Sequence, residues 1–228
     1  MKNLKTRLAV LAISFISFLG IQSANAASLE GLSVGVGYNQ AAFMGTGKET
    51  STSGAGTARG TDGKETGIFE DSVSSAFVEY NVGMVSFGVE YYLEDIKTPE
   101  NTNSQGTSGV AGTRVSNTVK ASFEDHTTVY AHLNLTEGAY VKLGYVMADV
   151  VTNESLGTGG AYPNVDTDGY MIGVGAQYTA DNGIFARAEF SVSDYDDVTA
   201  KNSNEADKEV SVTNMYGAAA SIKIGKSF

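Results

Sequence analysis

Apolar and polar side chains alternate along the chain with a period of two from Gly31 onward. This alternation predicts β-strands whose two faces meet different surroundings. Eight segments follow the pattern, and each is predicted to form one strand. Their apolar positions are Leu32, Val34, Val36 and Tyr38; Ala76, Val78 and Tyr80; Val85, Phe87, Val89, Tyr91 and Leu93; Val129, Ala131, Leu133 and Leu135; Val141, Leu143, Tyr145 and Met147; Tyr170, Ile172, Val174, Ala176 and Tyr178; Ala186, Ala188, Phe190 and Val192; and Tyr216, Ala218, Ala220, Ile222 and Ile224.

The connections between these segments alternate in length. Tight turns are predicted at residues 81–83, 136–138 and 180–183, where Gly or Asn can adopt a positive φ. Long polar loops are predicted at roughly 45–71, 96–114, 152–168 and 195–213. Short turns at one end and long loops at the other are the layout of a transmembrane β-barrel, in which the long loops face the outside of the cell.

The stretch from residue 114 to residue 135 allows two interpretations. Val119, Ala121 and Phe123 keep the parity of Val129, which indicates one long strand, with or without a bulge. A turn at 124–126 would instead give nine strands, and that odd number would leave the C-terminus outside. We therefore predict one long strand and an all-β fold, an eight-stranded antiparallel up-and-down transmembrane β-barrel.

Charged residues show which face of the strands is polar, and other features indicate which face meets lipid. The apolar face carries no charge before Lys226, whereas the opposite face holds several charged residues. A soluble β-sandwich would show the same alternation, but the loop asymmetry and the aromatic positions favour a barrel with its apolar face on lipid. Aromatic residues are expected in two interfacial belts: Tyr38, Tyr91, Tyr170 and Tyr216 near the long loops, and Tyr80, Tyr178 and Phe228 near the short turns.

The polar face is predicted to fill the interior. Eight strands enclose a lumen that side chains can just occupy, and buried ions must pair. We therefore predict a lumen ion-pair cluster formed by Glu79, Glu90, Lys142, Arg187, Glu189 and Lys223. Arg187 and Glu189 lie at i and i+2 on one strand and are expected to be coupled. Gly175, which is also on the inner face, is expected to accept a serine.

The first residues resemble an export signal. Lys2, Lys5 and Arg7 precede an apolar run at 8–21, and Ala24 and Ala26 then provide a small-x-small cleavage pattern. The run has 14 residues, fewer than the ~20 that a membrane-spanning helix needs. We expect residues 1–26 to be a cleaved signal peptide and 27–228 to be one barrel domain.

Composition narrows the function classes. Cleavage would remove three of 15 basic residues and none of 26 acidic ones, leaving 12 against 26 and a formal net charge of −14. Such a chain is a poor partner for nucleic acid. Cysteine is absent, so no disulfide or thiolate metal site is available. We expect no cofactor and no metal site, although acidic loop residues such as Asp194, Asp196 and Asp197 leave loose cation binding open.

The C-terminal segment 216–228, the export signal and the loop alternation together resemble the small outer-membrane β-barrel superfamily of Gram-negative bacteria, with its OmpA-, OmpX- and opacity-type members. We expect a monomer in the cell outer membrane, surrounded by lipid. The resemblance implies that the barrel-assembly machinery reads Phe228 as its signal, while Lys226 departs from the usual aromatic or apolar residue two places earlier.

The sequence leaves three possible functions open. The leading prediction is a non-enzymatic barrel with a side-chain-filled lumen that acts in surface interaction with an unknown extracellular ligand or in envelope integrity. The second is a small porin-like channel for solutes or ions. The third is an enzyme that modifies outer-membrane lipids, which would require a histidine and a hydroxyl on the outer wall, where His126 and Thr128 are the available pair.

Overall fold

The computed structural model describes residues 30–51, 64–106, 114–136, 138–157, 159–204 and 208–228. The predicted signal peptide lies outside these residues. Within them the strands are β1 (Leu32–Ser51), β2 (Lys64–Val82), β3 (Val85–Tyr92), β4 (Ile96–Lys97), β5 (Asn101–Gly106), β6 (Arg114–Asn134), β7 (Ala139–Leu156), β8 (Val165–Thr179), β9 (Ile184–Tyr195), β10 (Val198–Lys201) and β11 (Lys208–Ser227). In this part of the chain, no helix is long and apolar enough to cross a bilayer.

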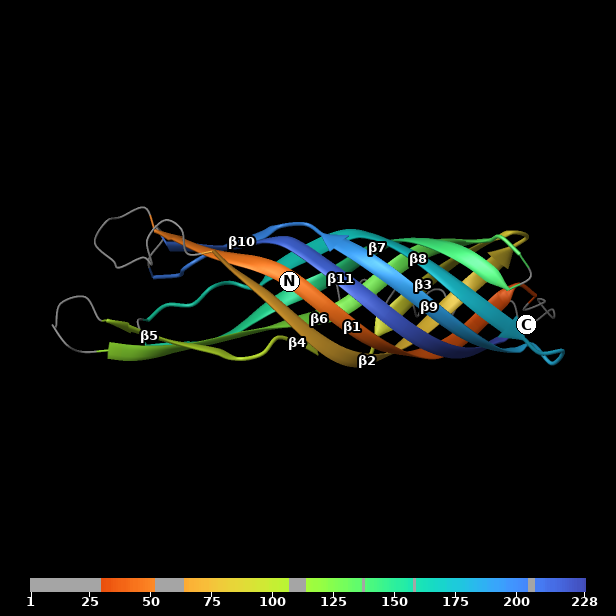
Figure 1. Cartoon of the computed structure of the whole chain (residues 1–228), viewed down its shortest axis with the longest axis horizontal. Helices are drawn as coiled ribbons and strands as arrows, with labels where there is room; N and C mark the ends of the chain where they lie inside the picture. Colours follow the sequence, from red (N-terminus) through yellow and green to blue (C-terminus); the bar gives the residue numbers. More distant parts are fainter. Residues whose placement is uncertain (1–29, 52–63, 107–113, 137, 158, 205–207) are drawn as a thin grey trace, which may run out of the picture.

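Eight of these strands close into a ring. The order is β1, β2, β3, β6, β7, β8, β9 and β11, and β11 pairs back onto β1, for example at Val36 and Ile224. All of these pairings are antiparallel (Figure 1). The predicted eight-stranded up-and-down barrel is therefore confirmed. The short turns of the ring include Gly83 and Gly183, whose φ values of 63° and 80° suit residues without a Cβ.

Strands continue into the segments that were predicted to be long loops. β1 runs to Ser51 and β2 begins at Lys64, so the pairing extends through Thr46 and Thr66. β4 and β5 pair with β6, and β10 pairs with β11, within the other expected loops. The prediction of loops at 45–71, 96–114, 152–168 and 195–213 was wrong in extent. Most side chains in these segments are polar, so the period-two contrast is weak there, yet their backbone groups still pair.

β6 contains a bulge that changes which of its residues point inward. Its register against β7 shifts between Glu124 and Thr127, and Asp125 has a φ of 53°. The prediction of one long strand is confirmed. The expectation that Phe123 shares a face with Val129 was wrong, because a bulge inserts an extra residue and reverses the alternation beyond it.

The ring is apolar outside and polar inside. On the outer wall Val36, Leu143 and Val174 are 58%, 62% and 54% exposed, whereas the inward-facing Glu79 and Lys142 are each 1% exposed. A soluble barrel or sandwich buries its apolar face and exposes its charges. The arrangement here suits hydrocarbon outside, as in transmembrane barrels.

Aromatic side chains lie at two levels on the outer wall. Tyr145 pairs in register with Tyr170, and their ring centroids are 5.6 Å apart. Tyr178 lies near the short-turn end of the same strand, β8. The eight steps from Tyr170 to Tyr178 cover about 26 Å at ~3.3 Å per residue, or roughly 20 Å along the axis of a barrel with ~40° strand tilt. That span approaches the ~25 Å apolar band of outer-membrane barrels.

The C-terminal residues complete the wall at the short-turn end. The backbone N–H of Phe228 donates to the carbonyl of Leu32 at 2.9 Å, and the Gly31 N–H donates to the Phe228 carbonyl at 3.0 Å. The ammonium group of Lys226 donates to the carbonyl of Asn182 in the neighbouring turn. The long side chain of Lys226 thus carries its charge away from the apolar wall to the rim.

Candidate functional site: the charged lumen and the apolar cap

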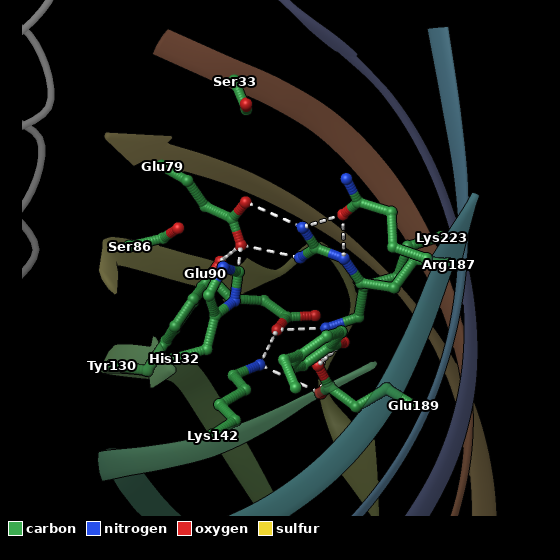
Figure 2. Close-up of polar contacts among 12 residues, drawn as sticks. Ser33, Glu79, Ser86, Glu90, Tyr130, His132, Lys142, Arg187, Glu189 and Lys223 are labelled. Carbon is green, nitrogen blue, oxygen red and sulfur yellow. Dashed lines mark hydrogen bonds and ion pairs between the residues drawn. The ribbon is translucent and has the colours of Figure 1, made fainter. Parts of the chain in front are cut away.

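The structure places all six predicted lumen residues inside the barrel, and each is at most 7% exposed. They come from five strands of the ring and face one another across its interior, as Figure 2 shows. They are Glu79 on β2, Glu90 on β3, Lys142 on β7, Arg187 and Glu189 on β9, and Lys223 on β11.

Four residues form the first group of contacts, here called the Arg187 group: Glu79, Tyr130, Gln177 and Arg187. The guanidinium donates from Nη1 and Nη2 to the two carboxylate oxygens of Glu79, at 2.6 and 2.9 Å. Tyr130 donates its hydroxyl to Glu79 Oε1 at 2.7 Å, and Gln177 accepts two further bonds from Arg187. A two-point guanidinium–carboxylate pair fixes both partners in direction as well as in distance.

The other four residues form a second group, here called the Lys–Glu square: Glu90, Lys142, Glu189 and Lys223. Lys142 Nζ lies 3.0 Å from Glu90 Oε2 and 2.9 Å from Glu189 Oε1. Lys223 Nζ lies 2.6 Å and 3.2 Å from the same two oxygens. Each ammonium therefore bridges both carboxylates, and the dashed contacts of Figure 2 connect the square across the lumen.

Two hydroxyl groups donate to the remaining oxygens of the two carboxylates in the square. Ser75 donates to Glu90 Oε1 at 2.8 Å, and Tyr140 donates to Glu189 Oε2 at 2.7 Å. Three carboxylates meet three cations, so the six charges balance. A buried ion left without a partner costs several kcal/mol, whereas a fully hydrogen-bonded set avoids that penalty. The cluster is therefore stable only as a whole.

The prediction that Arg187 pairs with Glu189 was wrong. Arg187 binds Glu79 from across the lumen, and Glu189 binds the two lysines. Side chains at i and i+2 point in the same direction along a strand, so their charged ends run parallel rather than toward each other. Residues that face each other across the lumen can meet end to end.

Gly175 does not have the room that the sequence suggested. A Cβ there would clash with the Tyr140 ring, whose hydroxyl is held by Glu189. We therefore expect Gly175→Ser to destabilise the barrel by about 1–3 kcal/mol, the usual cost of overpacking. Gly67→Ser is the matched control, because a Cβ at Gly67 meets nothing within 4 Å. Equal urea midpoints of the two variants in lipid vesicles would show that Tyr140 moves aside freely.

The two histidines face the interior. His132 Nδ1 lies 3.6 Å from Glu79 Oε1. His126 is 4% exposed, its ring stacks on Tyr92 at 4.3 Å, and its Nε2 lies 2.9 Å from the Tyr195 hydroxyl. Thr128 is also buried, at 4%. The pair considered for a lipid-modifying site, His126 and Thr128, thus lies inside the barrel, and not on the lipid-facing wall.

An apolar layer lies between these groups and the long-loop end, here called the apolar cap. Phe43, Phe69 and Phe123 stack with centroid distances of 5.3 to 6.5 Å. Buried apolar side chains surround them on other strands; these are Val146, Met171, Tyr195, Val198 and Met215. A cavity of about 20 Å³, room for one water, separates the cap from the Lys–Glu square.

This cap was not predicted from the sequence. Phe43 and Phe69 occupy inward parity, where polar residues were expected, and that exception was a usable signal. Phe123 reaches the cap only because of the bulge near Asp125. Of the acidic loop residues, Asp194, Asp196 and Asp197 are exposed, and within the described residues no group of three or more His, Cys, Asp or Glu is arranged to hold a metal ion.

A closed antiparallel ring with an apolar outer wall, aromatic side chains at two levels and paired charges inside is an outer-membrane-type β-barrel. An integral protein of this class is located in the outer membrane. No protein-family model matches the sequence, and the comparison with curated proteins gave no match.

Solved structures similar to this chain include small outer-membrane barrels. The outer membrane protein OprG from Pseudomonas aeruginosa is 8% identical, with a TM-score of 0.48 over 85% of this chain and 97% of that one. The outer membrane protease OmpT from Escherichia coli is 6% identical, with a TM-score of 0.46 over 88% and 98%. Neisserial surface protein A is 11% identical, with a TM-score of 0.37 over 84% and 97%. These similarities concern the fold alone.

Proposed function

We propose that the protein is a monomeric, non-enzymatic outer-membrane barrel that does not conduct solutes and that acts at its outward-facing end, in surface interaction or envelope integrity. The observation that carries the proposal is the double obstruction of the lumen. The Lys–Glu square joins β3, β7, β9 and β11 across the interior. The apolar cap lies between the square and the long-loop end.

Opening the lumen would cost considerable free energy. An ion would have to break the four contacts of the square, which leaves charges unpaired, and then cross an apolar layer that offers few polar partners. The side chains of the square come from four different strands, so they cannot swing aside as one loop. Within the same proposal, Phe228 serves as the assembly signal, because its ring stays exposed at the end of the closing strand.

Planar-bilayer recording tests the proposal. We expect no stable single-channel steps from the purified barrel, while a porin in the same bilayer conducts. The matched variant replaces Glu90, Lys142, Glu189 and Lys223 by serine, which removes the square without leaving an unpaired charge. Current through this variant but not through the natural protein would assign the block to the square. Stable steps from the natural protein would support the porin-like channel and overturn the proposal.

A further inference from the structure

The long-loop end of the barrel is hollow above the apolar cap. A cavity of about 530 Å³ has the three stacked phenylalanines of the cap among its walls. Val150, Val198, Val212 and Met215 also line this cavity. Its volume falls in the range of 300–1,000 Å³ that is typical of small-molecule sites, which are also mostly apolar.

A second, more polar cavity of about 490 Å³ adjoins the first. The two share Gly47, Glu65 and Thr98 in their walls. Tyr162 and Asn202 line only the polar one. Burial, and then the nearby Glu49 carboxylate, raise the pKa of the Tyr162 phenol to about 12, so this group remains a neutral hydrogen-bonding side chain. The hollow is therefore apolar next to the cap and polar farther out.

The apolar cavity also reaches the outer wall. Met44, Ile68 and Tyr216 belong to its lining and are 37%, 71% and 43% exposed. The β1–β11 register shifts at this place, between Met44 and Thr46, and Asn214 has a φ of 53°. The neighbouring pair of Gly45 and Gly67 adds no side chain to the wall. An apolar group can thus reach the cavity from the open end or from the lipid side.

We propose that this hollow binds a small amphiphile, a molecule with one apolar chain against the phenylalanines of the cap and a polar head toward Tyr162 and Asn202. The inference rests on the proposed function, since a closed lumen makes the hollow an end point and not a passage. Two sources offer this chemistry. One is an acyl chain of a surrounding lipid, and the other is a free amphiphile that arrives from outside.

The chain has no tryptophan, so one introduced tryptophan reports a single place. Phe69→Trp puts the reporter in the cap, and Leu143→Trp puts a control on the lipid-facing wall. The first arm adds 8-bromo-octanol to vesicles of unbrominated lipid that hold each variant. The second arm reconstitutes each variant in vesicles of phosphatidylcholine with brominated acyl chains. Bromine quenches tryptophan fluorescence on contact. Heat-modifiable gel migration verifies that each variant is folded. If Phe69→Trp fails to fold, Phe123→Trp replaces it as the reporter.

Two results support the proposal and distinguish the sources. If quenching of the Phe69→Trp reporter by bromo-octanol reaches a plateau as the concentration rises, while quenching of the Leu143→Trp control keeps increasing, the ligand is a free amphiphile. Loss of most of its emission in brominated vesicles, as at Leu143→Trp, indicates a lipid chain. Either quenching should disappear when Ala121→Phe fills the shared wall of the two cavities, and persist with Ala131→Phe on the lipid-facing side of the same strand.

The opposite result overturns the proposal. If the Phe69→Trp reporter is quenched by aqueous iodide but by neither brominated probe, the hollow holds water and no amphiphile. Quenching that Ala121→Phe leaves unchanged would also contradict the site. Neither outcome affects the conductance test, so failure of this inference and failure of the non-conducting proposal can be distinguished.

Discussion

Replacing Arg187 by methionine is expected to lower the free energy of unfolding by roughly 3–5 kcal/mol, because Glu79 would remain buried without its cation. Glu79 is 1% exposed, and the substitution removes both hydrogen bonds from the guanidinium to its carboxylate. The measurement is urea unfolding of the barrel in lipid vesicles, followed by tyrosine fluorescence.

A double-mutant cycle identifies the partner. Glu79→Gln together with Arg187→Met should cost clearly less than the sum of the single losses, because the pair is removed as a unit. The control cycle joins Arg187→Met with Glu189→Gln, whose carboxylate is held by Lys142 and Lys223, and it should show a smaller coupling. Strict additivity between positions 79 and 187 would contradict the pairing.

The second large effect is expected on the outer wall. Val174→Arg should destabilise the barrel by about 2–4 kcal/mol, since Val174 lies between the two aromatic levels and would place a charge at mid-bilayer. The same substitution at Tyr178, on the same strand near the short-turn end, should cost only ~0–1 kcal/mol because the side chain can reach water. Urea unfolding in vesicles measures both.

The main difference between these two variants is the depth of the new charge in the bilayer. Both positions are exposed and lie on the same face of β8. Equal losses at Val174 and Tyr178 would mean that the wall does not pass through a hydrocarbon layer between them.

The parts of the fold that cross the membrane could be predicted from sequence. Segments such as Tyr170 to Tyr178 separate hydrocarbon from a polar interior, and this contrast imposes a period of two. Beyond the membrane the contrast disappears. The Thr, Ser, Gly and Lys residues at the paired ends of β1 and β2 therefore gave no strand signal, although their backbones continue the ladder.

The candidate site was predictable in membership and not in pairing. Parity alone indicated that Arg187, Glu189 and Glu79 face inward. Which of them meet depends on strand tilt and register around the whole ring, and a single sequence carries neither. The apolar cap depends further on one local event, the bulge near Asp125, which rotates Phe123 from the wall to the interior.

The central claim, a barrel with lipid outside and a filled polar interior, is tested most directly by spin labels placed one at a time from Tyr170 to Tyr178 in vesicles. Gly173 and Gly175 are left out, because a side chain there would press on neighbouring atoms. The chain has no cysteine, so each label site is unique. We expect even positions to be accessible to oxygen, most strongly near Val174, and odd positions to be inaccessible to both oxygen and a water-soluble nickel complex. Access of the nickel complex to Val174 would contradict a lipid-facing wall. Its access to the odd positions would indicate an open, water-filled lumen and would contradict the filled interior.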